Sequence, residues 1–184
     1  MIIGITGTLG AGKGAAVTYL VKQKGYIHYS ARAFLAEEMT KENIAINRDS
    51  MIAFANELRQ KYGARYVFDQ LYQKAEKDIK PAVIESIRTV GEAESLKQKG
   101  GILIAVDADM SKRYDRIHGR GSVLDQVSFE KFKEQESREM YSIDSHKQSI
   151  GTVMQMADYT IENNGTLDEF QAEIERVLQK IEPR

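Results

Sequence analysis

The chain has 184 residues, a formal net charge of -1 and no cysteine. Its length suits one domain with a sizeable hydrophobic core, and the lack of cysteine excludes disulfides and thiolate metal sites. The nearly neutral charge excludes a general attraction to nucleic acid or anionic membranes, so any anion site must be built locally. The apolar start is too short for a secretory signal, and no run approaches the roughly 18 apolar residues of a membrane span. We therefore expect a cytoplasmic protein.

Short apolar runs, which are typical of buried strands, alternate along the chain with segments that carry helix caps and helix stops. Ser30 is a candidate N-cap, and Gly25, Gly63 and the pair Gly100-Gly101 end helical segments. In chain order the sequence predicts strand Ile2–Thr6, helix Lys13–Lys24, strand Tyr26–Tyr29, a helix from a Ser30 cap to Met39, a helix from an Asp49 or Ser50 cap to Tyr62, helix Ala64–Ile79, strand Pro81–Ser86, helix Thr89–Lys99, strand Ile102–Asp107, helix Ser111–His118, helix Ser128–Met140, strand Ala157–Ile161 and helix Thr166–Lys180.

This alternation predicts an α/β fold in which a five-stranded parallel sheet is covered by helices on both faces. We expect a single domain over residues 1–184. In such sheets the ligand lies at the carboxyl ends of the strands. The residues that directly follow each strand are therefore the candidates for function.

The first strand leads into Gly7-Thr8-Leu9-Gly10-Ala11-Gly12-Lys13, which has the spacing G-x-x-x-x-G-K of a phosphate-binding loop. Glycines let backbone amides curl around phosphate oxygens, the following helix points its positive end at the anion, and Lys13 supplies a cation for the outer phosphates. A plain glycine-rich turn between strand and helix is the alternative. The position of the motif, after a strand and at the start of a helix, favours a three-layer P-loop NTPase fold that binds ATP.

The loop departs from the usual motif at Gly14, where Ser or Thr would be needed to ligate magnesium directly. Lys-Gly at this point resembles the adenylate-kinase group of nucleoside monophosphate kinases, whose loops read G-x-x-G-x-G-K-G-T. That resemblance implies that magnesium is held mainly through water. This chain has Ala15 where the group has Thr, so one hydroxyl ligand of the phosphates is missing.

The third predicted strand leads into Glu85-Ser86-Ile87-Arg88. A carboxylate at a strand end beside the loop can order magnesium waters, and an arginine three residues later can clamp a phosphate. The segment resembles Asp-Gly-x-x-Arg of monophosphate kinases, with Glu85 in place of Asp. The alternatives are that Glu85 caps the next helix and that Arg88 is a surface residue. We expect Glu85 to hold the metal and bind substrate, and Arg88 to be a catalytic and substrate-binding residue.

Three arginines, Arg113, Arg116 and Arg120, recur at spacings of three and four, which places them on one helix face. Arginines that close over phosphoryl oxygens stabilise the transition state. Gly119 and Gly121 flank Arg120 and would allow a hinged lid, which we expect over about residues 111–142. The alternative is a solvated cationic face. We expect Arg116 and Arg120 to be catalytic and Arg113 to bind the cofactor.

The acceptor site is expected within about residues 30–80, where this fold inserts acceptor-binding helices. Arg48 and Arg59 are candidate acceptor ligands, for each of which surface solubility is the alternative, and Arg32 is a candidate substitute for the acceptor-binding residues of related kinases. The adenylate-kinase type has Ser-x-Gly-Asp-x-x-Arg after its second strand. Here Ser30 is followed by a segment without that Asp and second Arg, so the acceptor is expected to differ from AMP.

Most of the chain resembles the P-loop nucleoside monophosphate kinase-like family, which includes adenylate-kinase-related, dephospho-CoA kinase-like and phage-type deoxynucleoside monophosphate kinases. The similar stretches are Gly4–Gly14, Asn56–Gly63, Glu85–Arg88, Arg113–Arg120 and Ala157–Gly165. The last resembles Ala-Asp-x-x-Ile-x-Asn-x-Gly of dephospho-CoA kinases, which implies that Asn163 or Asn164 lies near the donor adenine. An Asn-Gly pair is also simply a good turn.

These features predict an ATP- and Mg²⁺-dependent phosphotransferase that acts on a small nucleotide-like acceptor, such as a nucleoside or deoxynucleoside monophosphate. A dephospho-CoA kinase-like enzyme is one alternative. A nucleotide-dependent switch or weak NTPase is another, which the missing hydroxyls favour. Phosphorylation of nucleic-acid ends would need a basic stripe, against which the neutral charge argues. We expect a monomer or homodimer without a membrane partner. The acceptor itself stays open.

Overall fold

The computed structural model describes residues 1–119 and 127–181. Its centre is a five-stranded sheet in the order β2-β3-β1-β4-β5, and every neighbouring pair is parallel. The strands are β1 (Ile2–Gly7), β2 (Ile27–Ser30), β3 (Ala82–Glu85), β4 (Ile102–Asp107) and β5 (Tyr159–Glu162). This confirms the predicted fold class. Because β1 lies between β3 and β4 and all three are parallel, their last residues lie close together at the carboxyl end of the sheet.

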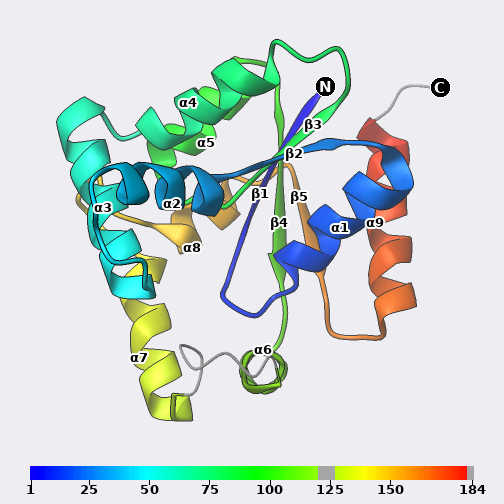
Figure 1. Cartoon of the computed structure of the whole chain (residues 1–184). Helices are drawn as coiled ribbons and strands as arrows, with labels where there is room; N and C mark the ends of the chain where they lie inside the picture. Colours follow the sequence, from blue (N-terminus) through cyan, green and yellow to red (C-terminus); the bar gives the residue numbers. More distant parts are fainter. Residues whose placement is uncertain (120–126, 182–184) are drawn as a thin grey trace.

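Helices cover both faces of the sheet, with α1 and α9 on one face and α4, α5 and α8 on the other (Figure 1). The helices are α1 (Lys13–Lys24), α2 (Ala31–Lys41), α3 (Arg48–Tyr62), α4 (Tyr66–Ala75), α5 (Val90–Gln98), α6 (Met110–His118), α7 (Phe129–Met140), α8 (Ile150–Gln155) and α9 (Leu167–Ile181). Each helix of the described residues is too short or too polar to cross a membrane.

Two hydrophobic cores lie on opposite faces of the sheet because side chains alternate along each strand. On β3, Val83 packs with the core under α1 and α9, whereas Ala82 and Ile84 pack with the core under the other helices. On β4, Ile104 packs with the core under α1 and α9, and Leu103 packs with the other core. This double burial explains why the strands read as continuous apolar runs.

The ends of several elements differ from the prediction for local reasons. The N-cap of α3 is Asn47, which forms a capping box with Ser50, so the expected cap at Asp49 or Ser50 was wrong. Helix α4 is shorter than the predicted Ala64–Ile79. The cap of α5 is Thr89, and Glu85 therefore plays no part as its cap. The short helix α8 was not predicted.

Candidate functional site

The predicted phosphate-binding loop connects the end of β1 to the start of α1. Gly10 and Gly12 have φ angles of 81° and 109°, in the left-handed region that favours glycine. Within the described residues no side chain caps α1, and the first turn of this helix carries no acidic residue that would compete for its backbone amides. The Lys13 ammonium folds back and donates to the carbonyls of Gly7 (2.8 Å) and Thr8 (2.7 Å). A loop with these features can hold phosphate oxygens.

Residues at the ends of β4 and β5 support the loop. The Asp107 carboxylate accepts a hydrogen bond from the Thr8 hydroxyl at 2.6 Å. The buried Asn163 amide donates to the Ala11 carbonyl at 2.7 Å. A Cβ on Gly12 would lie 2.2 Å from the Asn163 amide nitrogen, so packing as well as φ requires glycine there. Asn163 thus fixes the shape of the loop, and its contact with a donor adenine stays a prediction.

Arg113 is buried beside the loop. The alternative prediction, that it belongs to a solvated cationic face, was therefore wrong for this residue. Its guanidinium donates to the carbonyls of Ala108 (2.7 Å) and Leu9 (3.2 Å). The same group forms a two-pronged ion pair with Glu136 of α7. Arg113 therefore ties α6 and α7 to the loop.

Arg116 supports the loop indirectly. It donates at 2.8 Å to the carbonyl of Asn163, whose side chain contacts the loop. Its Nη1 atom is buried and has no hydrogen-bond partner among the described residues. Neither Arg113 nor Arg116 lines the cavities described below. Arg120 and Gly121 lie outside the described residues. Closure of this segment over a phosphate stays a prediction.

Glu85 is the last residue of β3 and lies at the carboxyl end of the sheet, next to β1. Its Oε1 atom accepts a hydrogen bond from the Ser30 hydroxyl (2.9 Å) and lies 3.5 Å from Nε2 of His28. The His28 contact lowers the pKa of Glu85 more than burial raises it, and the Ser30 hydroxyl adds to the lowering. Ser86 follows with a φ of 67°, at the place where the similar kinase segment has glycine. A carboxylate here suits a hard cation such as Mg²⁺.

A cavity of about 460 Å³ brings most of the predicted site residues together. We call it the main cavity. Its volume is typical of small-molecule sites. Its lining includes the predicted residues Leu9, Gly10, Gly12, Lys13, Gly14, Arg32, Arg48, Arg59, Glu85 and Arg88. A Cβ placed on Gly14 would meet no atom of the other described residues within 4 Å, so there is open space beside Gly14 in the first turn of α1.

Arg59 is almost fully buried, with 2% of its surface exposed, although it lines the main cavity. Its Nε and Nη2 atoms donate to one oxygen of Glu92, at 3.0 and 2.9 Å. The other oxygen of Glu92 accepts from the backbone amides of Arg88 (2.8 Å) and Thr89 (3.2 Å). Nη1 of Arg59 has no hydrogen-bond partner within the described part of the chain. A buried donor in this state is suited to bind an anion.

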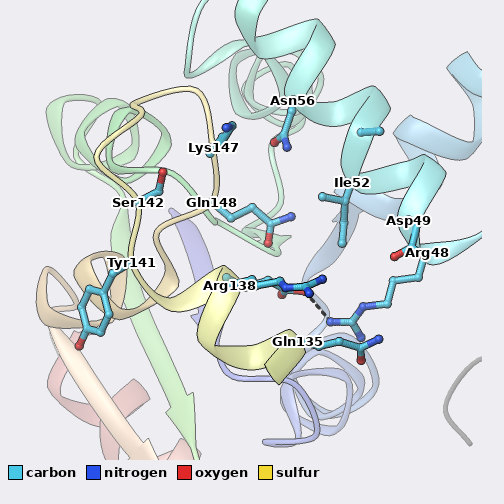
Figure 2. Close-up of a pocket in the computed structure, with 12 residues that line it drawn as sticks. Arg48, Asp49, Ile52, Asn56, Gln135, Arg138, Tyr141, Ser142, Lys147 and Gln148 are labelled. Carbon is cyan, nitrogen blue, oxygen red and sulfur yellow. Dashed lines mark hydrogen bonds and ion pairs between the residues drawn. The ribbon is translucent and has the colours of Figure 1, made fainter. Parts of the chain in front are cut away.

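A second cavity of about 380 Å³ lies between α3 and the end of α7 with the loop that follows it (Figure 2). It shares Arg48, Ile52, Glu139 and Gln148 with the main cavity. One oxygen of Glu139 accepts from Nη2 of Arg48 at 2.5 Å, and the other from Nη1 of Arg88 at 3.3 Å. Arg88 also donates to Gln148 at 2.8 Å. We call these contacts the partition, because Arg48, Glu139 and Gln148 line both cavities. Arg88 lines the main cavity only.

The sequence-based reasoning missed the acidic partners of the site, namely Asp107, Glu92, Glu136 and Glu139. Asp107 had a usable signal, since it ends a predicted strand just as Glu85 does. Glu139 had none, because it belongs to an acidic helix and its partner Arg48 is 91 positions away.

A family model described as an AAA domain matches residues 3–141 of the chain. A UPF0200 protein from Sulfurisphaera tokodaii is 30% identical over 181 residues, a match that covers 98% of this chain and 97% of that protein. A UPF0200 protein from Thermococcus kodakarensis is 27% identical over 188 residues and covers 98% of each chain.

Kinases are found among the solved structures that are similar to this chain. Shikimate kinase from Acinetobacter baumannii has a TM-score of 0.59 at 18% identity and covers 98% of this chain and 92% of its own. A gluconokinase from Sinorhizobium meliloti has a TM-score of 0.56 at 12% identity, with 97% and 94% covered. Likeness at these identities bears on the fold alone. The chain therefore belongs to the family described by this AAA domain model and to the UPF0200 proteins, and its fold is that of the P-loop kinases.

Proposed function

We propose that the protein is an ATP-dependent phosphotransferase that acts on a small nucleotide-like acceptor, of the nucleoside or deoxynucleoside monophosphate kinase type. The observation that carries this proposal is the main cavity, which is lined by the phosphate-binding loop and by four arginines from outside it. Phosphoryl transfer asks the protein for positioning and charge neutralisation more than for covalent chemistry. A cationic cavity next to a P-loop supplies both.

The donor site is the loop from Gly7 to Ala15. ATP fits these residues because the first turn of α1 is uncapped and open space lies in front of Gly14. Lys13 would exchange its contacts with the loop carbonyls for contacts with the outer phosphates. Arg113 and Asn163 serve ATP by holding the loop in shape, and Arg116 and Arg120 would add positive charge to the transferred group.

Mg²⁺ fits the site through Glu85, a carboxylate that is ionised at neutral pH and whose pKa is lowered further by the His28 contact. Bound Mg²⁺ would neutralise phosphate charge and orient the outer phosphates. Since Gly14 offers no hydroxyl, we expect Glu85 to act on the metal through ordered waters.

The acceptor site is the wall formed by Arg32, Arg48, Arg59 and Arg88. Nη1 of Arg59 has no hydrogen-bond partner among the described residues, and Arg88 donates to Glu139 and Gln148 at the partition. These cations suit an acceptor that carries an anionic group. The second cavity adjoins this wall, which also makes a larger acceptor of the dephospho-CoA type a candidate.

Coupled assays of ADP formation test the proposal. Purified protein with ATP and Mg²⁺ is offered nucleoside and deoxynucleoside monophosphates, dephospho-CoA, shikimate and gluconate in turn. We expect one class of nucleotide-like acceptor to raise ADP formation well above the level of a Lys13→Ala variant. Rates that match K13A with every acceptor would refute the proposed function. A rate above K13A that no acceptor changes would favour a weak NTPase.

A further inference from the structure

The second cavity adjoins the proposed acceptor wall and has the features of a binding site itself. Its volume of about 380 Å³ is within the range of small-molecule sites. Ile52 and Ala53 give it an apolar patch on α3, whereas Asn56 and Ser142 give it polar groups (Figure 2). The Oδ1 atom of Asn56 is buried and has no hydrogen-bond partner among the described residues. Buried polar atoms are rarely left unpaired, so this amide is suited to a ligand with an N–H or O–H donor.

Glu139 accepts hydrogen bonds from Arg48 and Arg88 in the way that an anionic ligand would. Each of its two oxygens faces a different arginine, and its side chain is only 12% exposed. Arg48 and Arg88 are also the acceptor ligands of the proposed function. An acceptor anion that used both arginines would therefore compete directly with Glu139.

We propose that the second cavity is part of the acceptor site, and that Glu139 is an internal carboxylate which the acceptor anion replaces between Arg48 and Arg88. The inference rests on the proposed function and narrows it. The acceptor class is a phosphate monoester whose organic part carries a hydrogen-bond donor. Its phosphate binds at the partition, and its organic part lies in the second cavity against Ile52 and Asn56.

The absence of tryptophan from the sequence allows a direct test of occupancy. Ala53 is exposed on α3 and lines only the second cavity, so A53W places a single fluorophore there. Gln60, exposed two turns further along α3 and lining neither cavity, gives the matched control Q60W. With the P-loop saturated by a non-hydrolysable ATP analogue, each variant is titrated with the phosphate monoesters AMP and dCMP.

We expect at least one phosphate monoester to produce a saturable change in the emission of A53W and none in Q60W. Calorimetry on the same variants gives the affinities independently. If these ligands leave the emission of A53W unchanged and bind it as they bind Q60W, the second cavity is not part of the acceptor site.

The role of Glu139 is tested with inorganic phosphate as the probe, again on protein saturated with the ATP analogue. E139Q removes the competing charge and should tighten phosphate binding by about tenfold, the size expected when one desolvated charge pair is altered. E130Q removes an exposed charge from the same helix at a residue that lines neither cavity, and should change binding less than about twofold. Unchanged or weaker binding in E139Q would show that Glu139 positions the arginines and is not displaced.

These readouts do not depend on turnover, so the two proposals fail separately. If no acceptor raises ADP formation, the proposed function is refuted while the fluorescence result still decides whether the cavity is used. If transfer occurs and A53W stays silent, only the inference about the second cavity falls.

Discussion

Glu85 is the carboxylate that we propose to act on the metal. Its carboxylate has a pKa below the ordinary value of 4.5, chiefly because of the contact with His28. A carboxyl group whose pKa is lower in the folded than in the unfolded state stabilises the fold above its unfolded pKa. That contribution is lost as the pH falls through the lower, folded-state pKa.

A Glu85→Gln substitution should therefore reduce the free energy of unfolding at neutral pH, and the loss should be smaller in acid. The difference between wild type and E85Q is expected to shrink as the pH falls below about 4.5. Urea unfolding of both proteins over this pH range measures the difference. A loss of stability that is equally large in strong acid would mean that the charge of Glu85 is not its cause.

At the scale of elements, β1, the loop and α1 form a unit that depends on side chains from later in the chain. Asp107 is the last residue of β4, Asn163 directly follows β5, and both hydrogen-bond to the loop. The observed shape of the loop therefore depends on residues from three strands of the sheet.

An Asn163→Ala substitution removes the hydrogen bond to the buried Ala11 carbonyl. Leaving that carbonyl unpaired should cost about 1–3 kcal/mol of the free energy of unfolding. It should also weaken binding of an ATP analogue, because the loop loses part of its fixed shape. Asn164→Ala is the control, since the Asn164 side chain accepts from the Asp109 amide on the exposed side. Urea unfolding and calorimetry measure the two effects. Lost stability with unchanged binding in N163A would limit Asn163 to a structural role.

The elements that could be predicted from the sequence are those with a local signal. The apolar run Ile102–Asp107 and the Ser30 cap are local features, and both were found where expected. Helix α8 could not be predicted, because its six residues include Gly151 and lack a helical period. It exists because Val153 packs fully buried in the core, which is a tertiary effect.

At the scale of the whole molecule, the site lies where a parallel sheet would place it. The first strand, its neighbours and the helices that cover them bring the loop, Glu85 and Arg88 together at the carboxyl end of the sheet. The motif and the strand–helix alternation were enough to predict this arrangement. The partition and the second cavity were not predictable, because they depend on contacts between α3 and α7 that no short segment encodes.

The central claim is that the phosphoryl group moves from ATP to an acceptor bound in the main cavity. Transfer of label from [γ-³²P]ATP tests it most directly, with the products separated by chromatography. The account predicts that label appears in a phosphorylated nucleotide-like acceptor with wild-type protein and not with K13A. Label recovered only as inorganic phosphate, whatever acceptor is present, would contradict it.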